Sequence, residues 1–265
     1  MITPILMLGA GRMGGAMLEG WLAAGAFPAS ELMIRDPAPG PAALAAGQAG
    51  ANLHPTDADI SAARTVVLAV KPQLWRDAAA EMSAGLAADA VVVSIAAGVK
   101  AADIASAFAG RRVARVMPTT AVAIGQGTAS IYADDAVARD RALALFQPLG
   151  VVVPLADENG MHAATAVSGS APAYLYAFIE SLEAAGITAG LSPEDAGRLA
   201  RSTVTGAAAL LATSGEEPTE LRRQVTSPGG TTEAALNVLL GAKGLQVLMR
   251  EAVGAAVRRS KELGA

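Results

Sequence analysis

The chain has 265 residues, which is enough for two domains that each bury a hydrophobic core. Its formal net charge of -4 at pH 7 argues against the basic surface that a nucleic-acid-binding protein needs. It has no cysteine and only two histidines, His54 and His162, so we expect no disulfide, no cysteine nucleophile and no metal site.

The apolar segments are too short to cross a membrane, since the longest are Val66 to Val70 and Ala90 to Ala97. Met1 leads directly into a strand pattern and shows no signal-peptide features. We therefore expect a cytoplasmic protein with no nucleic-acid or membrane partner.

The first predicted element is a strand at residues 4–8, followed by a glycine-rich turn and a helix around residues 16–22. The turn has the spacing GxGxxG, with Gly9, Gly11 and Gly14 in the glycine positions. Such glycines allow a tight turn, let a pyrophosphate approach the backbone and bring helix and strand close together. The motif alone is weak evidence for dinucleotide binding. Here a strand precedes it and a helix follows, so it predicts that the chain binds a dinucleotide.

A second strand is predicted at residues 32–35 and ends at Asp36, about 20 residues beyond Gly14. A carboxylate at this place can hold the ribose of the adenosine moiety and would repel a 2'-phosphate. The pattern therefore favours NADH at least as much as NADPH. Arg35 opposes this preference, because its guanidinium can turn toward a 2'-phosphate.

Further strands are predicted at residues 65–70, 90–95, 112–117, 128–133 and 151–155, with helical segments such as 73–86 and 101–109 between them. This alternation is typical of a Rossmann-type, doubly wound, mainly parallel sheet. Ligands bind at the carboxyl ends of such strands, where Ala69 to Pro72 and Ile95 to Gly98 fall. These loops should line the cofactor, although a solvated surface lysine is an equally good interpretation of Lys71.

After Leu155 the strand signals stop and helical spacing continues to the end. We expect a dinucleotide-binding domain at residues 1–156 and an all-helical domain for substrate binding and dimerisation at residues 157–265. Ser192 to Asp195 predicts one helix start, with Pro193 at the first helical position.

The segment from Ser227 to Thr232 reads Ser-Pro-Gly-Gly-Thr-Thr and precedes an apolar helix. Glycines without a Cβ, hydroxyls and unpaired helix N–H groups together form a cradle for a small carboxylate. The alternative is an ordinary turn in which Thr231 caps the helix.

Five stretches carry a resemblance to a known family: Gly9 to Gly14, Ala69 to Gln73, Arg115 to Pro118, Ser168 to Tyr174 and Val225 to Leu236. With them the chain resembles, over nearly its whole length, the pyrroline-5-carboxylate reductases. These enzymes reduce 1-pyrroline-5-carboxylate to L-proline with NADPH or NADH. The last stretch looks like the family signature and is the most specific.

The resemblance implies roles for two groups of residues and a homodimer or higher homo-oligomer. Glu158, Gly230, Thr231 and Thr232 would hold the substrate, with the Thr232 hydroxyl bonded to the ring nitrogen as the catalytic contact. Without the resemblance, an acid at the start of a helix is the better interpretation of Glu158. The expected NADP(H) or NAD(H) site comprises Gly9, Ala10, Gly11, Arg12, Met13, Gly14, Arg35, Asp36, Ala69, Val70, Lys71, Pro72, Ile95, Ala96 and Ala97. Of these, Arg35 is included because of its charge and not because of the resemblance.

The chain departs from the family pattern at three positions. Thr119 and Ala121 stand where the family usually has asparagine and proline, and Ala171 replaces a glycine. Thr119 in place of asparagine removes an amide near the nicotinamide end of the site. The methyl of Ala171 would narrow the space for the substrate.

Two other interpretations remain open. A two-domain dehydrogenase of the 3-hydroxyacid or 6-phosphogluconate type typically has a catalytic lysine on a helix of its second domain. Here that domain has only Lys243, in a predicted turn, and Lys261, in the predicted C-terminal tail. The other interpretation is a nucleotide-binding regulatory protein without turnover, which the Thr231-Thr232 cradle disfavours.

Overall fold

The computed structural model describes residues 1–262 and divides the chain into two compact units. The first comprises Met1–Gly169 together with the chain from Ala256 on, and the second comprises Ser170–Ala255. The expected boundary after residue 156 differs from this division, because α7 (Gly160–Ala164) and the end of α12 (Leu245–Glu262) both belong to the first unit. A hydrogen bond of 2.9 Å between His162 Nδ1 and Ser260 Oγ joins these two helices.

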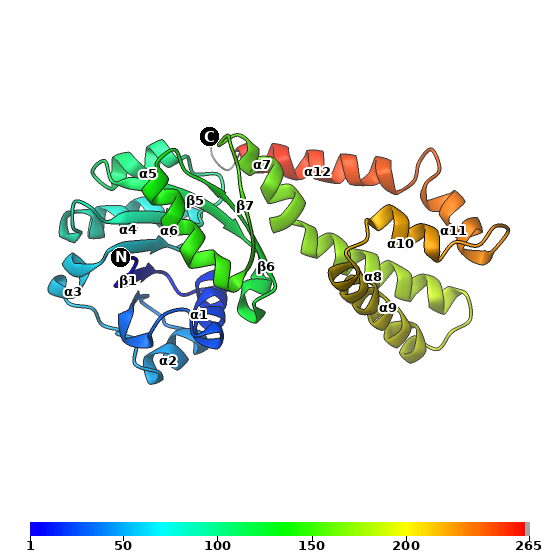
Figure 1. Ribbon diagram of the computed structural model, residues 1–265, viewed down its shortest axis with the longest axis horizontal. Helices are drawn as coiled ribbons and strands as arrows, with labels where there is room; N and C mark the ends of the chain where they lie inside the picture. The colour runs from blue at the N-terminus through cyan, green and yellow to red at the C-terminus, as the bar shows by residue number, and fades with distance from the viewer. Residues whose placement is uncertain (263–265) are drawn as a thin grey trace. The chain divides into compact units, whose positions relative to one another are not determined.

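Within residues 1–262, seven strands of the first unit form one sheet in the order β2-β1-β3-β4-β5-β6-β7 (Figure 1). Neighbouring strands are parallel except for β5 and β6, which are antiparallel. This confirms the predicted doubly wound, mainly parallel sheet. The strands are β1 (Ile5–Leu8), β2 (Leu32–Arg35), β3 (Thr65–Leu68), β4 (Val91–Ser94), β5 (Arg112–Pro118), β6 (Gly127–Tyr132) and β7 (Gly150–Pro154).

Helices cover both faces of this sheet, because consecutive side chains of a strand point to opposite faces. In β1, Ile5 and Met7 join one buried cluster, while Leu6 and Leu8 join another. The first cluster receives side chains from α1 (Arg12–Ala24), α2 (Pro41–Gln48) and α6 (Ala136–Phe146). The second receives them from α3 (Asp57–Ala62), α4 (Trp75–Met82) and α5 (Ala101–Ala107).

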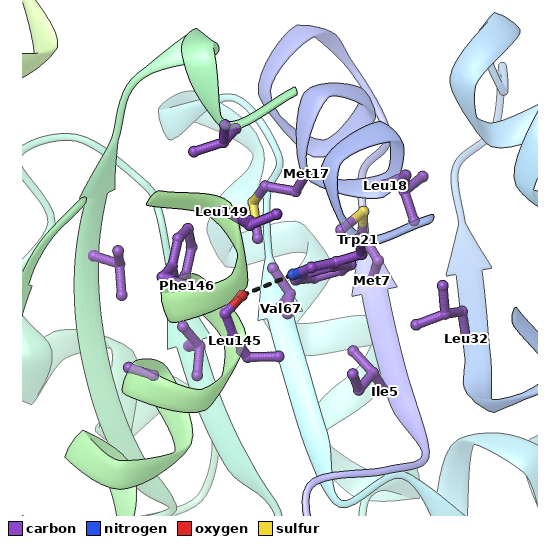
Figure 2. Packing of buried hydrophobic residues seen from close by; sticks show 14 of the residues in the cluster. Ile5, Met7, Met17, Leu18, Trp21, Leu32, Val67, Leu145, Phe146 and Leu149 are labelled. Atoms are coloured by element: carbon purple, nitrogen blue, oxygen red, sulfur yellow. Dashed lines mark hydrogen bonds between the residues drawn. The ribbon is translucent and has the colours of Figure 1, made fainter. Parts of the chain in front are cut away.

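Trp21 lies in the centre of the first cluster and is fully buried (Figure 2). Its indole N–H donates to the carbonyl oxygen of Leu145 at 2.7 Å, which satisfies the ring's polar atom inside the apolar cluster. Helix α1 is thereby fixed to α6, and the glycine-rich turn that precedes α1 is held against the sheet.

The helix predicted at residues 73–86 is shorter in the structure. Helix α4 spans Trp75–Met82, and a 3₁₀ turn flanks it on each side, at Pro72–Leu74 and Ser83–Gly85. Gly85 is a poor helix former, so the regular α-helix ends before it.

The second unit is helical, as expected. It contains α8 (Ala171–Thr188), α9 (Pro193–Ser214), α10 (Pro218–Gln224), α11 (Thr231–Leu239) and most of α12. The predicted start of α9 is confirmed, since Ser192 Oγ accepts from the Asp195 N–H at 3.1 Å. None of the helices in residues 1–262 has the length and apolarity to cross a membrane.

Many large apolar side chains of this unit are exposed in the single chain. They lie on four of its helices and in the turns beside them, and include Leu175, Tyr176, Phe178, Leu182, Ile187, Leu199, Leu210, Leu211, Val238, Leu239, Leu240, Leu245, Leu248 and Met249. Of the buried apolar residues in the described chain, only Ala196 and Ala200 belong to this unit.

Candidate active site

The glycine-rich turn between β1 and α1 has the geometry that a dinucleotide requires. Gly9 has a φ of +89°, and a Cβ on it would lie 2.9 Å from the carbonyl oxygen of Ala69. A Cβ on Gly14 would collide with the carbonyl oxygen of Gly9. A Cβ on Gly11 would meet nothing within 4 Å, so Gly11 alone of the three faces open space. The three glycines therefore make the turn, pack helix on strand and leave room for a ligand.

The open space beside Gly11 is a cavity of about 680 Å³. Ala10, Gly11 and Arg12 line it at the start of α1, where unpaired helix N–H groups and the helix dipole favour an anion. The other lining residues are Gly15, Ala16, Glu19, Ala38, Gly40, Pro41, Ala42 and Thr120. Met13, the second residue of α1, packs against the first cluster.

Asp36 connects this turn to the end of β2. One carboxylate oxygen accepts from the Ala10 N–H at 2.6 Å, and the other accepts from the Ala38 N–H at 2.8 Å. Asp36 and Arg35 also line a second cavity, of about 520 Å³, whose wall includes Val70. The side chain expected at the ribose thus braces the glycine turn and borders the space next to it.

The loops after β3 and β4 lie side by side at the carboxyl edge of the sheet, because these strands are parallel neighbours. Ala69, Val70, Lys71 and Pro72 follow β3, and Ile95, Ala96 and Ala97 follow β4. The Ile95 N–H donates to the carbonyl oxygen of Leu68 at 3.1 Å, which ties the start of the second loop to the end of β3. Lys71 is exposed. All fifteen residues expected to hold the cofactor thus belong to the first unit.

Glu158 belongs to the first unit as well. Its Oε1 accepts from the Ala101 N–H at 2.7 Å and from Arg115 Nη1 at 2.9 Å. The Arg115 side chain is only 4 % exposed, whereas that of Glu158 is 26 % exposed. No hydrogen bond to Glu158 Oε2 occurs among residues 1–262, so this oxygen is free to accept one from a ligand.

The cradle residues Gly230, Thr231 and Thr232 belong to the second unit and lie at the start of α11. Gly230 is the N-cap, without a side-chain cap, so the alternative in which Thr231 caps the helix is wrong. The Glu233 carboxylate braces the turn instead, accepting from the Gly229 N–H at 2.7 Å. Thr231 is exposed and Thr232 is half-buried.

Sequence reasoning missed two side chains that shape these sites. Glu233 is at the third position of α11, where an acid that reaches back to the preceding turn is a known helix-start pattern, so a signal was present. Arg115 gave no such signal, because its partner Glu158 lies far along the chain.

Comparison with known proteins decides between the interpretations. A family model described as "Pyrroline-5-carboxylate reductase dimerisation" matches residues 158–263, and one described as "NADP oxidoreductase coenzyme F420-dependent" matches residues 4–98. The pyrroline-5-carboxylate reductase of Pseudomonas aeruginosa is 38 % identical over 99 % of this chain and 98 % of its own. The chain belongs to the pyrroline-5-carboxylate reductase family.

Solved structures of pyrroline-5-carboxylate reductases agree with this. The protein from Coxiella burnetii superposes with a TM-score of 0.91 at 29 % identity, covering 100 % of both chains. The Plasmodium falciparum protein, described with NADP bound, superposes with a TM-score of 0.84 at 25 % identity, covering 99 % of this chain and 98 % of its own.

The three positions that depart from the family pattern lie near the end of β5 and at the start of α8. Thr119 is buried, and its Oγ1 accepts from the Thr128 N–H at 3.0 Å, so it fixes the turn after β5. Ala121 lies in the 3₁₀ turn Thr120–Ile124, and Ala171 is the first residue of α8.

The lysines that the dehydrogenase alternative required are poorly placed for it. Lys243 lies in the turn between α11 and α12. Lys261 lies in the last turn of α12, not in a tail as the sequence suggested, but this part of α12 belongs to the first unit and not to the second.

Proposed function

We propose that the protein reduces 1-pyrroline-5-carboxylate to L-proline with hydride from NADH or NADPH. The observation that carries this is the family membership, which extends over the whole chain. The glycine-rich turn supports it independently, since Gly11 opens onto a cavity at a helix start and the residues fit a dinucleotide pyrophosphate.

The bound nicotinamide supplies the hydride, and the protein supplies position and charge. We propose that the N–H groups of Gly230 to Thr232 hold the substrate carboxylate. Thr232 Oγ1 then bonds the ring nitrogen, and Glu158 Oε2 favours the protonated imine. Glu158 Oε1 is already occupied by Arg115 and Ala101, so the carboxylate is fixed before the substrate arrives.

The test is oxidation of NADH and NADPH by the purified protein, followed by absorbance, with 1-pyrroline-5-carboxylate as substrate. We expect turnover with the imine and none with 3-hydroxyacids and an oxidised cofactor. Cofactor binding without turnover would support the regulatory interpretation instead.

The cofactor preference is a finer proposal. We expect kcat/KM with NADH to equal or exceed that with NADPH, because Asp36 lines the cavity in which we propose that the adenosine ribose binds. Two charges about 4 Å apart repel by about 4 kcal/mol at an effective dielectric of 20, and by less when they are exposed. A preference for NADPH of tenfold or more would overturn this proposal.

Assembly and location complete the proposal. We propose a homodimer or a larger homo-oligomer, since the second unit exposes many large apolar side chains and matches the dimerisation family model. A cytoplasmic location is also proposed, and cell fractionation with an antibody against the chain tests it.

A further inference from the structure

The cavity of about 520 Å³ beside Asp36 has an unusual charge distribution. Its wall carries three carboxylates, from Asp36, Asp77 and Glu81, against one guanidinium, from Arg35, and one imidazole, from His54. Asp77 and Glu81 are one helical turn apart on α4, so both face the cavity from the same side.

Arg35 is the cation best placed for a 2'-phosphate, since it directly precedes the ribose acid Asp36 and lines the same cavity. In the structure it is already paired, because its Nη2 lies 2.7 Å from Glu81 Oε1. A phosphate that enters the cavity must therefore compete with Glu81 for Arg35 and also accept Glu81 as a neighbouring negative charge.

We propose that Glu81 is a specificity-determining residue, which disfavours cofactors with a 2'-phosphate by occupying Arg35 and adding negative charge to the wall. It leaves the binding of unphosphorylated cofactors almost unchanged. The inference rests on the proposed function in one respect only, namely that this cavity receives the adenosine end of a dinucleotide.

The size of the effect is modest. The side chains of Arg35 and Glu81 are 49 % and 56 % exposed, and exposed ion pairs are weak and screened by salt. Releasing Arg35 and removing one like charge act in the same direction, so together they should change affinity by about 3- to 10-fold at low ionic strength.

The experiment is calorimetric titration of the full-length protein with ADP-ribose and with 2'-phospho-ADP-ribose, neither of which can be turned over. Glu81→Gln should tighten binding of the phosphorylated ligand by about 3- to 10-fold and change that of ADP-ribose by less than about twofold. The gain should shrink as salt is added. In an Arg35→Gln background, Glu81→Gln should improve the affinity for the phosphorylated ligand by a smaller factor, because no Arg35 guanidinium remains to be released.

A matched control is available in the Arg64–Asp89 pair, which also has an N–O distance of 2.7 Å and side chains that are 45 % and 63 % exposed. Asp89 is not among the cavity residues, so Asp89→Asn removes the same charge from the chain but should leave the affinity ratio unchanged. An equal effect of Glu81→Gln on both ligands, or an effect no larger than that of Asp89→Asn, would overturn the proposal.

The outcomes also separate this inference from the proposed reaction. If the protein does not reduce the imine but Glu81→Gln still tightens binding of the phosphorylated ligand alone, the proposed reaction is refuted and the role of Glu81 is supported. If neither ligand binds, the proposed cofactor site and the proposed role of Glu81 are both wrong.

Discussion

Thr231 and Thr232 are adjacent in α11 but differ in exposure, the first being exposed and the second half-buried. In the proposed site, backbone N–H groups can hold the substrate carboxylate whatever the side chains are, whereas we propose that the Thr232 hydroxyl bonds the ring nitrogen. That hydrogen bond strengthens as hydride arrives and the nitrogen becomes more basic. Thr232→Ala should therefore lower kcat by about 10- to 100-fold, with a smaller change in KM for the imine.

Thr231→Ala is the matched control for this prediction. Thr231 makes no capping hydrogen bond, so its removal should change kcat by less than about threefold. Steady-state kinetics on both variants, with cofactor affinity measured separately, decide the matter. Loss of kcat in Thr231→Ala but not in Thr232→Ala would reverse the two roles.

His162 makes stability depend on pH. Burial lowers the pKa of its imidazole, and the positive charges of Arg115, Lys261 and Lys100 lower it further, while Glu158 acts in the opposite direction. The folded protein therefore binds this proton less readily than the unfolded chain. As pH falls below about 6.5, the unfolded chain is protonated first and the free energy of unfolding decreases.

We expect His162→Gln to flatten the decrease in stability between about pH 7 and about pH 5, measured by urea unfolding. Ser260→Ala separates the effect of burial on the His162 pKa from the effect of the hydrogen bond, because it removes the bond to Nδ1 but leaves the imidazole in place. It should lower stability by about 1 kcal/mol at all pH values and keep the slope. An unchanged slope in His162→Gln would assign the pH dependence to other groups.

Residues of the site differ in how well the sequence predicts them. Gly9, Gly11 and Gly14 were predictable because their roles depend on neighbours within one short turn. The pairs Arg115–Glu158 and Arg35–Glu81 join residues 43 and 46 positions apart, so only the folded sheet brings them together. The sequence pointed to Glu158 and to Arg35, but not to the partner that each one meets.

At the scale of elements, the turn between β1 and α1 offers a test that separates folding from binding. Gly14→Ala places a methyl against the carbonyl oxygen of Gly9, where α1 packs on the turn. We expect a loss of about 1 to 3 kcal/mol in stability, together with weaker cofactor binding, because the helix must move away from β1.

Gly11→Ala should behave differently, because its methyl would meet no protein atom within 4 Å and would enter the cavity instead. We expect normal thermal unfolding but at least tenfold weaker binding of ADP-ribose, measured by calorimetry. Equal binding by Gly11→Ala and the unchanged protein would place the pyrophosphate elsewhere.

Element ends were harder to predict than element types. The bounds of β2 agree with the sequence, whereas α4 is shortened by the 3₁₀ turns beside it. Hydrophobic spacing reports which side of a helix is buried but not where its last hydrogen bond forms. The sequence also did not indicate that the end of α12 belongs to the first unit, because helical spacing does not show which domain a helix packs against.

At the scale of the whole molecule, the exposed apolar side chains of the second unit predict association. We expect sedimentation at micromolar concentration to give at least a dimer, because an apolar surface of this extent is unusual on a monomer. Replacing Leu182 and Leu199 by Lys should shift the equilibrium toward monomer, while Val137→Lys on α6 of the first unit should not. A stable monomer of the unchanged protein would contradict the prediction.

The positions of the tryptophans give the molecule a built-in optical probe. Trp21 and Trp75, the only two in the chain, lie in the two buried clusters on opposite faces of the sheet, and residues 170–255 contain none. Indole emission therefore reports the opening of the nucleotide-binding unit alone, whereas far-ultraviolet circular dichroism sums the helices of both units. If the two signals change at different urea concentrations, the two units unfold separately and a single free energy of unfolding does not describe the protein.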